Sequence, residues 1–413
     1  MRRSVPIFAL VFRLVLMREA RADLLDRVND ALSIREPTIQ LQLQLSGLLD
    51  LEGYFIDQRA PGLIDTDDDF LFNPRLSIFL DAQWTSHLYF FAQLRVDRGF
   101  DPSDDGAQVR LDEYFLRYTP FDQPWINFQA GKFATVVGNW VPRHYSWDNP
   151  FINAPLPYEN LTGIWDSAAP DDVDDLFSWG HVGEYDTGDY SDKYLRLPII
   201  WGPSYASGFA VSGAIGKFDY AAEIKNRPLA SRPESWDATQ VGFAHPTFSM
   251  RVGVRPSEMW DLGFSASAGP YLLAEAAPTL PPGRSIGDYR ELVLGQDISF
   301  AWHHWQLWAE VFEARFEVPR IGDADTVAYY LEAKYKITPQ LFGALRWNQQ
   351  LFDTVSDYGE QVKWGNNTWR VDAALGYRFT NYLQAKVQYS FNHEDTVLRQ
   401  GEQLAAVQLT IKF

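Results

Sequence analysis

Charged side chains recur at every second position inside apolar stretches of this sequence, and this spacing limits the chemistry that they can do. In residues 88–97, Leu, Phe, Ala, Leu and Val at the even positions alternate with a series that ends in Gln93, Arg95 and Asp97. Successive side chains of a β-strand point to opposite faces, so such a segment has one apolar and one polar face. A face of mixed charges can attract and steer polar solutes by electrostatics, but it supplies no nucleophile.

The same alternation in other apolar segments assigns further charged residues to the polar face. Cations and anions are about equally frequent there, so the formal charge of −18 arises largely from the loops. A balanced set of charges suits a wide aqueous space with modest selectivity. The residues expected to line that space are Arg75, Asp81, Arg95, Asp97, Arg110, Arg251, Arg255, Glu332, Lys334, Arg346, Arg370, Asp372, Arg378 and Lys386.

The segment 135–204 carries a second group of candidate residues. Connections of this length are usually functional or disordered, and its many aromatic residues argue against disorder. We expect the segment to fold inward, with the carboxylates of its acidic second half opposite wall arginines; a lid packed on the outer rim is the alternative. The residues expected in this constriction loop are Trp140, Trp147, Trp165, Asp166, Asp171, Asp172, Asp174 and Asp175.

Residues for catalysis or tight metal binding are scarce. The chain has no Cys, and its seven His fall mostly in expected turns, loops or strand ends, without a nucleophile motif. The pair His303–His304 fits a tight turn better than a metal site. Carboxylates near Asp171–Asp175 suit Ca²⁺ in type, but their spacing is not that of an EF-hand, so solvation is preferred. We predict no enzyme activity, no cofactor and no metal.

The elements that would position these residues are strands. From Ile39 onward the apolar residues recur with a period of two, and the pattern returns about sixteen times. The expected strands span 39–55, 70–84, 87–98, 107–119, 124–134, 205–215, 218–227, 246–256, 259–268, 289–301, 304–316, 325–337, 340–352, 367–380, 382–393 and 402–413.

Short and long connections alternate between these strands. Seven connections are brief, such as Thr85–Ser86 and Gly216–Lys217, and the longer ones are polar and rich in Asp, Gly and Pro. Up-and-down transmembrane β-barrels combine short periplasmic turns with long external loops and an even number of strands. We therefore predict an all-β, antiparallel, up-and-down transmembrane barrel over 39–413, with 135–204 as its third external loop. A soluble sandwich fits the turn lengths less well, and a propeller would show a blade repeat that this sequence lacks.

The C-terminal residues 404–413 place the barrel in a particular membrane. One parity is apolar and ends in Phe413, and a final strand of this kind resembles the assembly signal of Gram-negative outer-membrane barrels. We expect the barrel-assembly machinery to recognise Phe413, and outer-membrane lipid and lipopolysaccharide to surround the protein. An aromatic share of 15% suits interfacial girdles, and the acidic balance argues against nucleic acid as a partner.

The N-terminus has the features of an export signal. A basic start and an apolar stretch precede Ala20-Arg21-Ala22, a small-x-small cleavage site, although Arg13 and Arg18 interrupt the pattern. We predict a signal peptide over 1–22. Helical spacing of apolar residues in 23–32 then predicts a short periplasmic helical segment over 23–38.

Two strands need a local irregularity. In 109–118 the apolar residues change parity near Asp112–Glu113, which predicts a β-bulge. Lys132 falls on the lipid-facing parity of its strand, where a charge near the membrane midplane costs about 2–4 kcal/mol. A bulge or a strand end is therefore expected at Lys132.

Together these features favour a water-filled channel for passive diffusion of small polar solutes and ions. Trp140, Trp147 and Trp165 could instead stack on sugar rings, so a carbohydrate-selective channel is one alternative. An outer-membrane enzyme is a weaker alternative.

Several motifs resemble one known family. Asn73–Asp81, Phe91–Asp97, Val109–Pro120, Phe128–Phe133 and Val137–Gly138 are similar in order and spacing to the phosphate-selective porin O/P-like group. The resemblance covers roughly residues 70–140 and implies a trimeric outer-membrane channel. The chain lacks a dominant ladder of Lys and Arg and is strongly acidic, so phosphate selectivity is not carried over.

Overall fold

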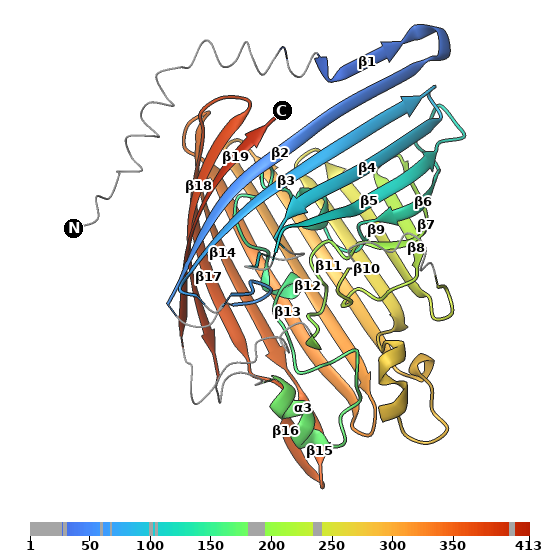
Figure 1. Ribbon diagram of the computed structural model, residues 1–413, viewed down its shortest axis with the longest axis vertical. Coiled ribbons are helices and arrows are strands. Elements are labelled where there is room, and N and C mark those ends of the chain that lie inside the picture. The colour runs from blue at the N-terminus through green and yellow to red at the C-terminus, as the bar shows by residue number, and fades with distance from the viewer. Residues whose placement is uncertain are drawn as a thin grey trace, which may run out of the picture.

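The computed structural model describes residues 27, 31–57, 61–66, 68–98, 102–103, 106–180, 195–233, 242–395 and 401–413. Seventeen strands of this part of the chain form one sheet, and sixteen of them, β2–β14 and β17–β19, pair in a continuous antiparallel circle. The circle closes because the last strand, β19, pairs with the first barrel strand, β2 (Figure 1). The predicted all-β barrel is confirmed.

The strand bounds lie close to the predicted ones. The barrel strands are β2 (Leu41–Ile56), β3 (Phe70–Trp84), β4 (Leu88–Asp97), β5 (Gln108–Tyr118), β6 (Asn127–Phe133), β7 (Ala206–Ile215), β8 (Phe218–Lys225), β9 (Thr247–Ser257), β10 (Trp260–Pro270), β11 (Arg290–Trp302), β12 (Trp305–Val318), β13 (Gly322–Lys336), β14 (Leu341–Phe352), β17 (Thr368–Arg378), β18 (Leu383–Glu394) and β19 (Glu402–Lys412).

The other elements lie outside the barrel wall. They are β1 (Ser33–Glu36), the hairpin β15 (Thr354–Asp357) and β16 (Glu360–Lys363), the helix α3 (Val173–Gly180) and the short 3-10 helices η1 (Pro37–Ile39), η2 (Val141–Arg143), η3 (Leu156–Tyr158), η5 (Ala274–Thr279) and η6 (Ile286–Asp288). No helix in the described ranges is long and apolar enough to cross a membrane.

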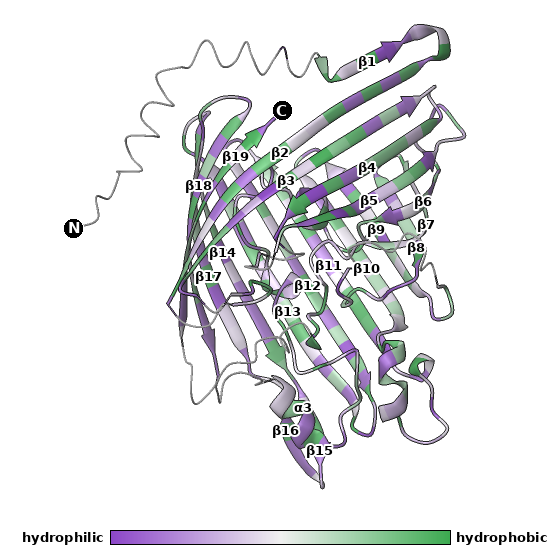
Figure 2. Ribbon diagram, in the orientation of Figure 1, coloured by the Kyte–Doolittle hydropathy of each residue, from purple (hydrophilic) through white to green (hydrophobic). Residues whose placement is uncertain are grey.

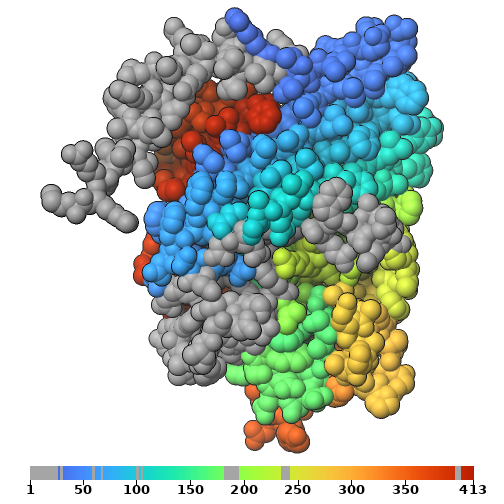
Figure 3. Space-filling model, in the orientation of Figure 1, coloured from blue at the N-terminus to red at the C-terminus, as the bar shows by residue number. Residues whose placement is uncertain are grey.

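The two ends of the barrel differ. The brief turns and the C-terminus lie at one end, here called the short-turn end, while α3, η5 and the β15–β16 hairpin lie at the other, the long-loop end (Figure 1). Figure 3 shows the long-loop segments gathered below the barrel strands. Their apolar side chains, including Val173, Leu176, Ala276 and Val355, form one buried cluster.

The outer face of the wall is apolar. Side chains of the predicted lipid-facing parity are largely exposed, for example Leu331 (55%), Leu345 (63%) and Val387 (49%), whereas the neighbouring inward residues are buried. Figure 2 shows the alternation of hydropathy along the strands. A soluble protein rarely exposes such a continuous apolar surface, so this face is suited to hydrocarbon.

The predicted helical segment over 23–38 is corrected at its end. Ser33–Glu36 is a strand that pairs with Leu41–Gln44 of β2. The physical reason is an open edge: β19 covers β2 only from Leu48 to Ile56, and unpaired main-chain groups favour a further strand. Arg27 and Ala31 are helical. The predicted signal peptide, 1–22, lies outside the described residues.

The terminal residue Phe413 extends the seam between β2 and β19, the first and last barrel strands. Gly47 donates its N–H to the Phe413 carbonyl at 2.8 Å, and the Phe413 N–H donates to the Gly47 carbonyl at 3.0 Å. The Phe413 ring lies where a Cβ of residue 47 would be. Only glycine leaves room for the ring at this position.

Both predicted irregularities are present. Gln93 of β4 pairs with Glu113 and Leu94 pairs with Leu111, so Asp112 is the extra residue of a bulge in β5. Lys132 is the second-last residue of β6, and its Nζ donates to the Leu111 carbonyl at 3.3 Å beside that bulge. The bulge and the strand end together allow an outward-parity lysine.

Candidate functional site

The loop that begins at residue 135 enters the barrel, as predicted. The Gly138 N–H donates to Ser265 Oγ at 3.2 Å, and the N–H groups of Asn139 and Trp140 donate to the Glu310 carboxylate. The hydroxyl of Tyr158, further along the loop, donates to the same carboxylate at 2.8 Å. One wall residue, Glu310 of β12, thus fixes two parts of the loop.

Apolar packing holds the loop against one side of the wall. The Trp140 ring lies 4.6 Å from the Tyr158 ring, and Tyr158 meets Phe312 edge-on at 5.7 Å. Val293 and Tyr330 belong to the same buried cluster. The inner face of β11–β13 is therefore covered by the loop.

Cations of the next strands bind the main chain of the loop. Lys386 Nζ donates to the carbonyls of Ser146, Asn149 and Phe151 at 2.8–3.0 Å. Arg346 donates to the Asn153 carbonyl at 3.3 Å.

Two further cations contact the loop in the same way. Arg378 Nη2 donates to the Trp147 carbonyl at 2.9 Å, and Arg370 binds both the Ala154 carbonyl and the Glu159 carboxylate. Arg346, Arg370, Arg378 and Lys386 were predicted to line the pore, but they lie on the inner face beneath the loop. The hydrogen bonds of these four cations hold the loop in place.

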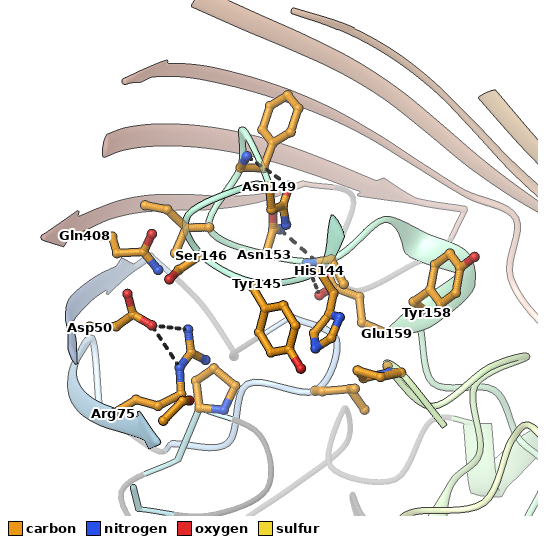
Figure 4. A pocket seen from close by; sticks show the side chains of 18 of the residues that line it. Asp50, Arg75, His144, Tyr145, Ser146, Asn149, Asn153, Tyr158, Glu159 and Gln408 are labelled. Atoms are coloured by element: carbon orange, nitrogen blue, oxygen red, sulfur yellow. Dashed lines mark hydrogen bonds and ion pairs between the residues drawn. The ribbon is translucent and has the colours of Figure 1, made fainter. Parts of the chain in front are cut away.

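A cavity of about 130 Å³ remains on the opposite side, between the loop and β2–β4. Figure 4 shows Asp50, Arg75 and Gln408 on one side of this cavity, with Tyr145 and Ser146 of the loop across from them. Gln93 and Arg95 of β4 also line it. We call this cavity, with the side chains that line it, the passage.

The charges of the passage are arranged in layers. Arg75 Nη2 lies 2.6 Å from Glu52 Oε1 and 3.2 Å from Asp50, and Arg95 Nε lies 2.8 Å from Asp97. The arginine side chains are 17% and 13% exposed, whereas the three carboxylates are at most 3% exposed. A solute in the passage would therefore meet guanidinium groups in front of buried carboxylates.

The remaining predicted wall residues also lie on the inner face, in ion pairs or near rings. Arg110 is buried against Asp97 and Asp112. Arg251 pairs with Asp219, Asp261 and Asp297, Asp372 pairs with Arg346 and Arg370, and Glu332 pairs with Arg143 and Arg346. Lys334 lies over the Phe342 ring, and Asp81 accepts a hydrogen bond from the Tyr89 hydroxyl. Arg255, which is 65% exposed near the short-turn end, pairs with Asp261.

His144 of the loop also lines the passage. Its Nδ1 contacts the Val141 carbonyl at 2.5 Å and its Nε2 contacts the Tyr205 hydroxyl at 3.0 Å. Burial lowers the pKa of His144 to about 4, so the ring is neutral at pH 7. Sequence reasoning did not single out His144, Arg143 or Glu159, and the available signal was their position among aromatic and Pro residues. Strand parity placed Glu310 on the inner face but gave no sign that it holds the loop.

Four described carboxylates of the acidic half do not face wall arginines, so the expectation is wrong for them; Asp171 lies 3.6 Å from Arg320, in the turn between β12 and β13. Asp171, Asp172, Asp174 and Asp175 lie at the start of α3, at the long-loop end. The Asp175 N–H donates to Asp172 Oδ1 and the Asp171 N–H to Asp175 Oδ2, each at 3.0 Å. Carboxylates stabilise helix N-termini, and here they also stay in water.

Asp166 differs from these four carboxylates because it is buried. Burial raises its pKa to about 7. No group of three or more His, Asp or Glu in the described ranges is arranged to hold a metal ion.

The three tryptophans do not form a row. Trp140 packs inside the barrel on Tyr158, Trp147 lies beneath Arg378 at 4.9 Å, and Trp165 stacks on Trp179 at 4.4 Å near α3. Each ring therefore has its own partner.

No protein-family model and no curated protein matches this chain. Solved structures match its fold: OmpF of Salmonella typhi in complex with daunomycin has a TM-score of 0.58 at 12% identity, over 92% of this chain and all of OmpF. The outer membrane channel DcaP of Acinetobacter baumannii has a TM-score of 0.54 at 11% identity, over 92% and 99%. The anion-selective porin from Comamonas acidovorans also has 0.54 at 11%, over 90% and 100%.

This chain has the fold of an outer-membrane porin. The porin fold agrees with the closed barrel, the inward loop and the apolar outer face. The finer resemblance to the phosphate-selective porin O/P-like group is not confirmed, because these matches are to other porins and channels.

Proposed function

We propose that this protein is an outer-membrane channel through which small polar solutes and ions diffuse passively. The observation that carries the proposal is the passage between the loop and β2–β4, lined by Arg75, Arg95, Gln93 and Tyr145. Polar groups that converge on a narrow opening favour hydrated solutes over apolar ones.

The proposal places the short-turn end in the periplasm and the long-loop end outside the cell. In this proposal the protein is a trimer, the assembly machinery recognises Phe413, and lipopolysaccharide contacts the barrel. The porin fold, shared with the outer membrane channel DcaP and with an anion-selective porin, supports transport rather than catalysis. The separate partners of Trp140, Trp147 and Trp165 favour simple diffusion over a slide for sugars.

Conductance in planar lipid bilayers tests the proposal. The purified protein should produce discrete current steps whose size rises with salt concentration, because the ions cross in water. Heat-denatured protein is the control and should give no steps. Folded protein that inserts but gives no steps would contradict the proposal.

The charge preference of the passage can be measured in the same system. A reversal potential in asymmetric KCl reports cation against anion permeability. Arg95→Gln should shift that potential toward cation preference, because Asp97 and Asp112 would lose a neutralising partner. Arg315→Gln, which changes an exposed outward-facing arginine of β12, is the matched control and should not shift it.

A further inference from the structure

A series of aromatic side chains begins at the passage and continues along the inner wall of the barrel. The Tyr145 ring, which lines the passage, meets Phe79 of β3 edge-on at 5.2 Å between ring centres, and Phe79 lies 6.2 Å from Phe91 of β4. Phe115 of β5 lies 5.4 Å from Phe91 and 6.1 Å from Tyr89. We call these five side chains the ring series.

The membrane does not explain the ring series, because its wall members face inward. Tyr89 and Phe91 share the parity of Arg95 in β4. Phe115 is the cross-strand partner of Phe91, so it faces the same way. The interior of a water-filled barrel is normally polar. Phe79, Tyr89 and Phe91 are nevertheless partly exposed there, so their rings offer apolar contact to a solute.

Arg75 and Arg95, which line the passage, retain N–H groups for a solute. Arg75 donates to Asp50 and Glu52 through Nε and Nη2, and its Nη1 forms no hydrogen bond with a described residue. Arg95 lies in ion-pair contact with Asp97 but donates no hydrogen bond within the described part of the chain. A guanidinium carries five N–H donors, and the two side chains are 17% and 13% exposed. A solute in the passage can therefore reach donors of both arginines.

The carboxylates around the passage already have partners. Asp50 accepts from Arg75. Glu159 of the loop, which also lines the passage, accepts from Arg370. Glu52 accepts from four side chains, those of Tyr54, Asn73, Arg75 and Gln408. Asp50 and Glu52 are at most 3% exposed, behind the guanidinium of Arg75. Because the Coulomb energy falls with distance, the passage favours an anionic group.

The arginines and the rings are close enough for one small molecule to contact both. Arg95 pairs with Ser77, and Phe79 lies two positions further along β3 on the same face. Such diagonal neighbours are about 7–8 Å apart. The cavity volume of about 130 Å³ limits the solute to a small molecule. A small solute that carries both an anionic group and an aromatic ring matches these features.

We propose that the passage selects small aromatic carboxylates. The carboxylate binds Arg75 and Arg95. The ring packs against Phe79 and Tyr145. The inference deepens the proposed channel function and rests on it. Phe91 lies on the short-turn side of Arg95, so it receives the ring as the solute moves toward the periplasm.

Block of the KCl current in planar bilayers tests the inference on the wild-type protein. Benzoate, cyclohexanecarboxylate and benzamide are added in separate experiments at neutral pH. Cyclohexanecarboxylate keeps the charge and the size without the aromatic ring, and benzamide keeps the ring without the charge. The half-blocking concentration of benzoate should be about fivefold lower than that of either control solute. Equal half-blocking concentrations for benzoate and either control would overturn the inference.

Variants of β3 and β4 locate the ring contact. Phe79→Leu and Phe91→Leu, tested separately, each remove a ring and keep an apolar side chain, so each should raise the half-blocking concentration of benzoate about threefold. The half-blocking concentration of cyclohexanecarboxylate should stay the same. Phe90→Leu, which changes an exposed outward-facing ring of β4, is the matched control and should be blocked as the wild type is. If both inward variants behave as Phe90→Leu does, the ring series takes no part in selection and the inference is overturned.

The KCl current before any solute is added separates this inference from the proposed function. Wild-type protein that gives no current steps would contradict the channel, and this inference with it. Normal current steps with equal block by benzoate and cyclohexanecarboxylate would contradict the selectivity alone.

Discussion

At the scale of residues, the passage depends on side chains that a solute does not touch. Glu310 accepts main-chain N–H groups of the loop, and Lys386 donates to three of its carbonyls. A buried polar group that loses its partner costs about 1–3 kcal/mol, so each of these contacts fixes the path of the loop. The loop path in turn sets the width of the passage.

Gly138→Ala should displace the start of the loop. Gly138 has φ +77°, and a Cβ there would overlap the Tyr158 hydroxyl and the Glu310 carboxylate. Single-channel conductance in planar bilayers should therefore rise. Gly106→Ala, where a Cβ would meet no atom within 4 Å, is the control and should conduct as the wild type does. Equal conductance in all three proteins would show that Gly138 does not fix the passage.

Lys386→Met should loosen the middle of the loop. The methionine side chain keeps the aliphatic part of the lysine against the wall but has no N–H to donate. Three buried carbonyls would lose a donor, at about 1–3 kcal/mol for a group left unpaired. Open-channel current noise should increase and the thermal midpoint should fall. Lys217→Met, at an exposed turn, should change neither. Quiet currents in a variant that is equally destabilised would contradict this role for Lys386.

The face of each charged residue could be predicted from the sequence, but its partner could not. Arg346 and Arg370 are inward because alternation is a local property of a strand. Their bonds to the loop join residues 193 and 211 positions apart, and no local pattern records such a contact. Sequence reasoning therefore placed these cations in the passage when they lie beneath the loop.

At the scale of elements, sixteen strands could be predicted to within three residues at each end, because each repeats the same apolar alternation. The loop elements could not. The carboxylates of 171–175 were predicted to face wall arginines, whereas they lie at the N-terminus of α3, where Asp172 and Asp175 accept main-chain N–H groups. The β15–β16 hairpin is four residues on each side and turns at Tyr358–Gly359, both with positive φ, so its pattern is too short to detect.

Gly47→Val should weaken the seam between β2 and β19. Its side chain would overlap the Phe413 ring, which must then leave the position that closes the barrel. The heat-induced shift in electrophoretic mobility should occur at a lower temperature than in the wild type. Gly343→Ala, another outward glycine with room for a Cβ, is the control and should match the wild type. If the mobility of Gly47→Val shifts at the wild-type temperature, the contact between Gly47 and the Phe413 ring does not stabilise barrel closure.

Asp166 should make the long-loop end more stable in mild acid. Burial raises the pKa of Asp166 from 3.8 to about 7. The protonated carboxyl therefore contributes fully to the folding stability of this end below pH 3.8, and the contribution is lost as pH rises through 7. The Leu273 N–H, which donates to the Asp166 carbonyl at 2.8 Å, should exchange with a higher protection factor at pH 5.5 than at pH 8.5. In Asp166→Asn the two protection factors should be equal. A persistent difference would assign the pH dependence to another group.

At the scale of the whole molecule, the barrel separates three environments. Its outer face is apolar, one side of its interior is filled by the loop, and the other side holds the passage beside Arg75 and Arg95. The division follows from strand parity together with a loop that binds only part of the wall. In the proposed channel, permeation depends on this division more than on any one charge.

The most direct measurement labels two neighbouring positions of β4 in a chain that has no native cysteine. Arg95→Cys faces the passage and Leu94→Cys faces outward. In a lipid bilayer, a charged, membrane-impermeant thiol reagent should modify Arg95→Cys and reduce its current, and should leave Leu94→Cys unmodified with unchanged current. Modification of Leu94→Cys at the same rate, or an unreactive Arg95→Cys, would contradict the assignment of one parity to lipid and the other to a water-filled passage.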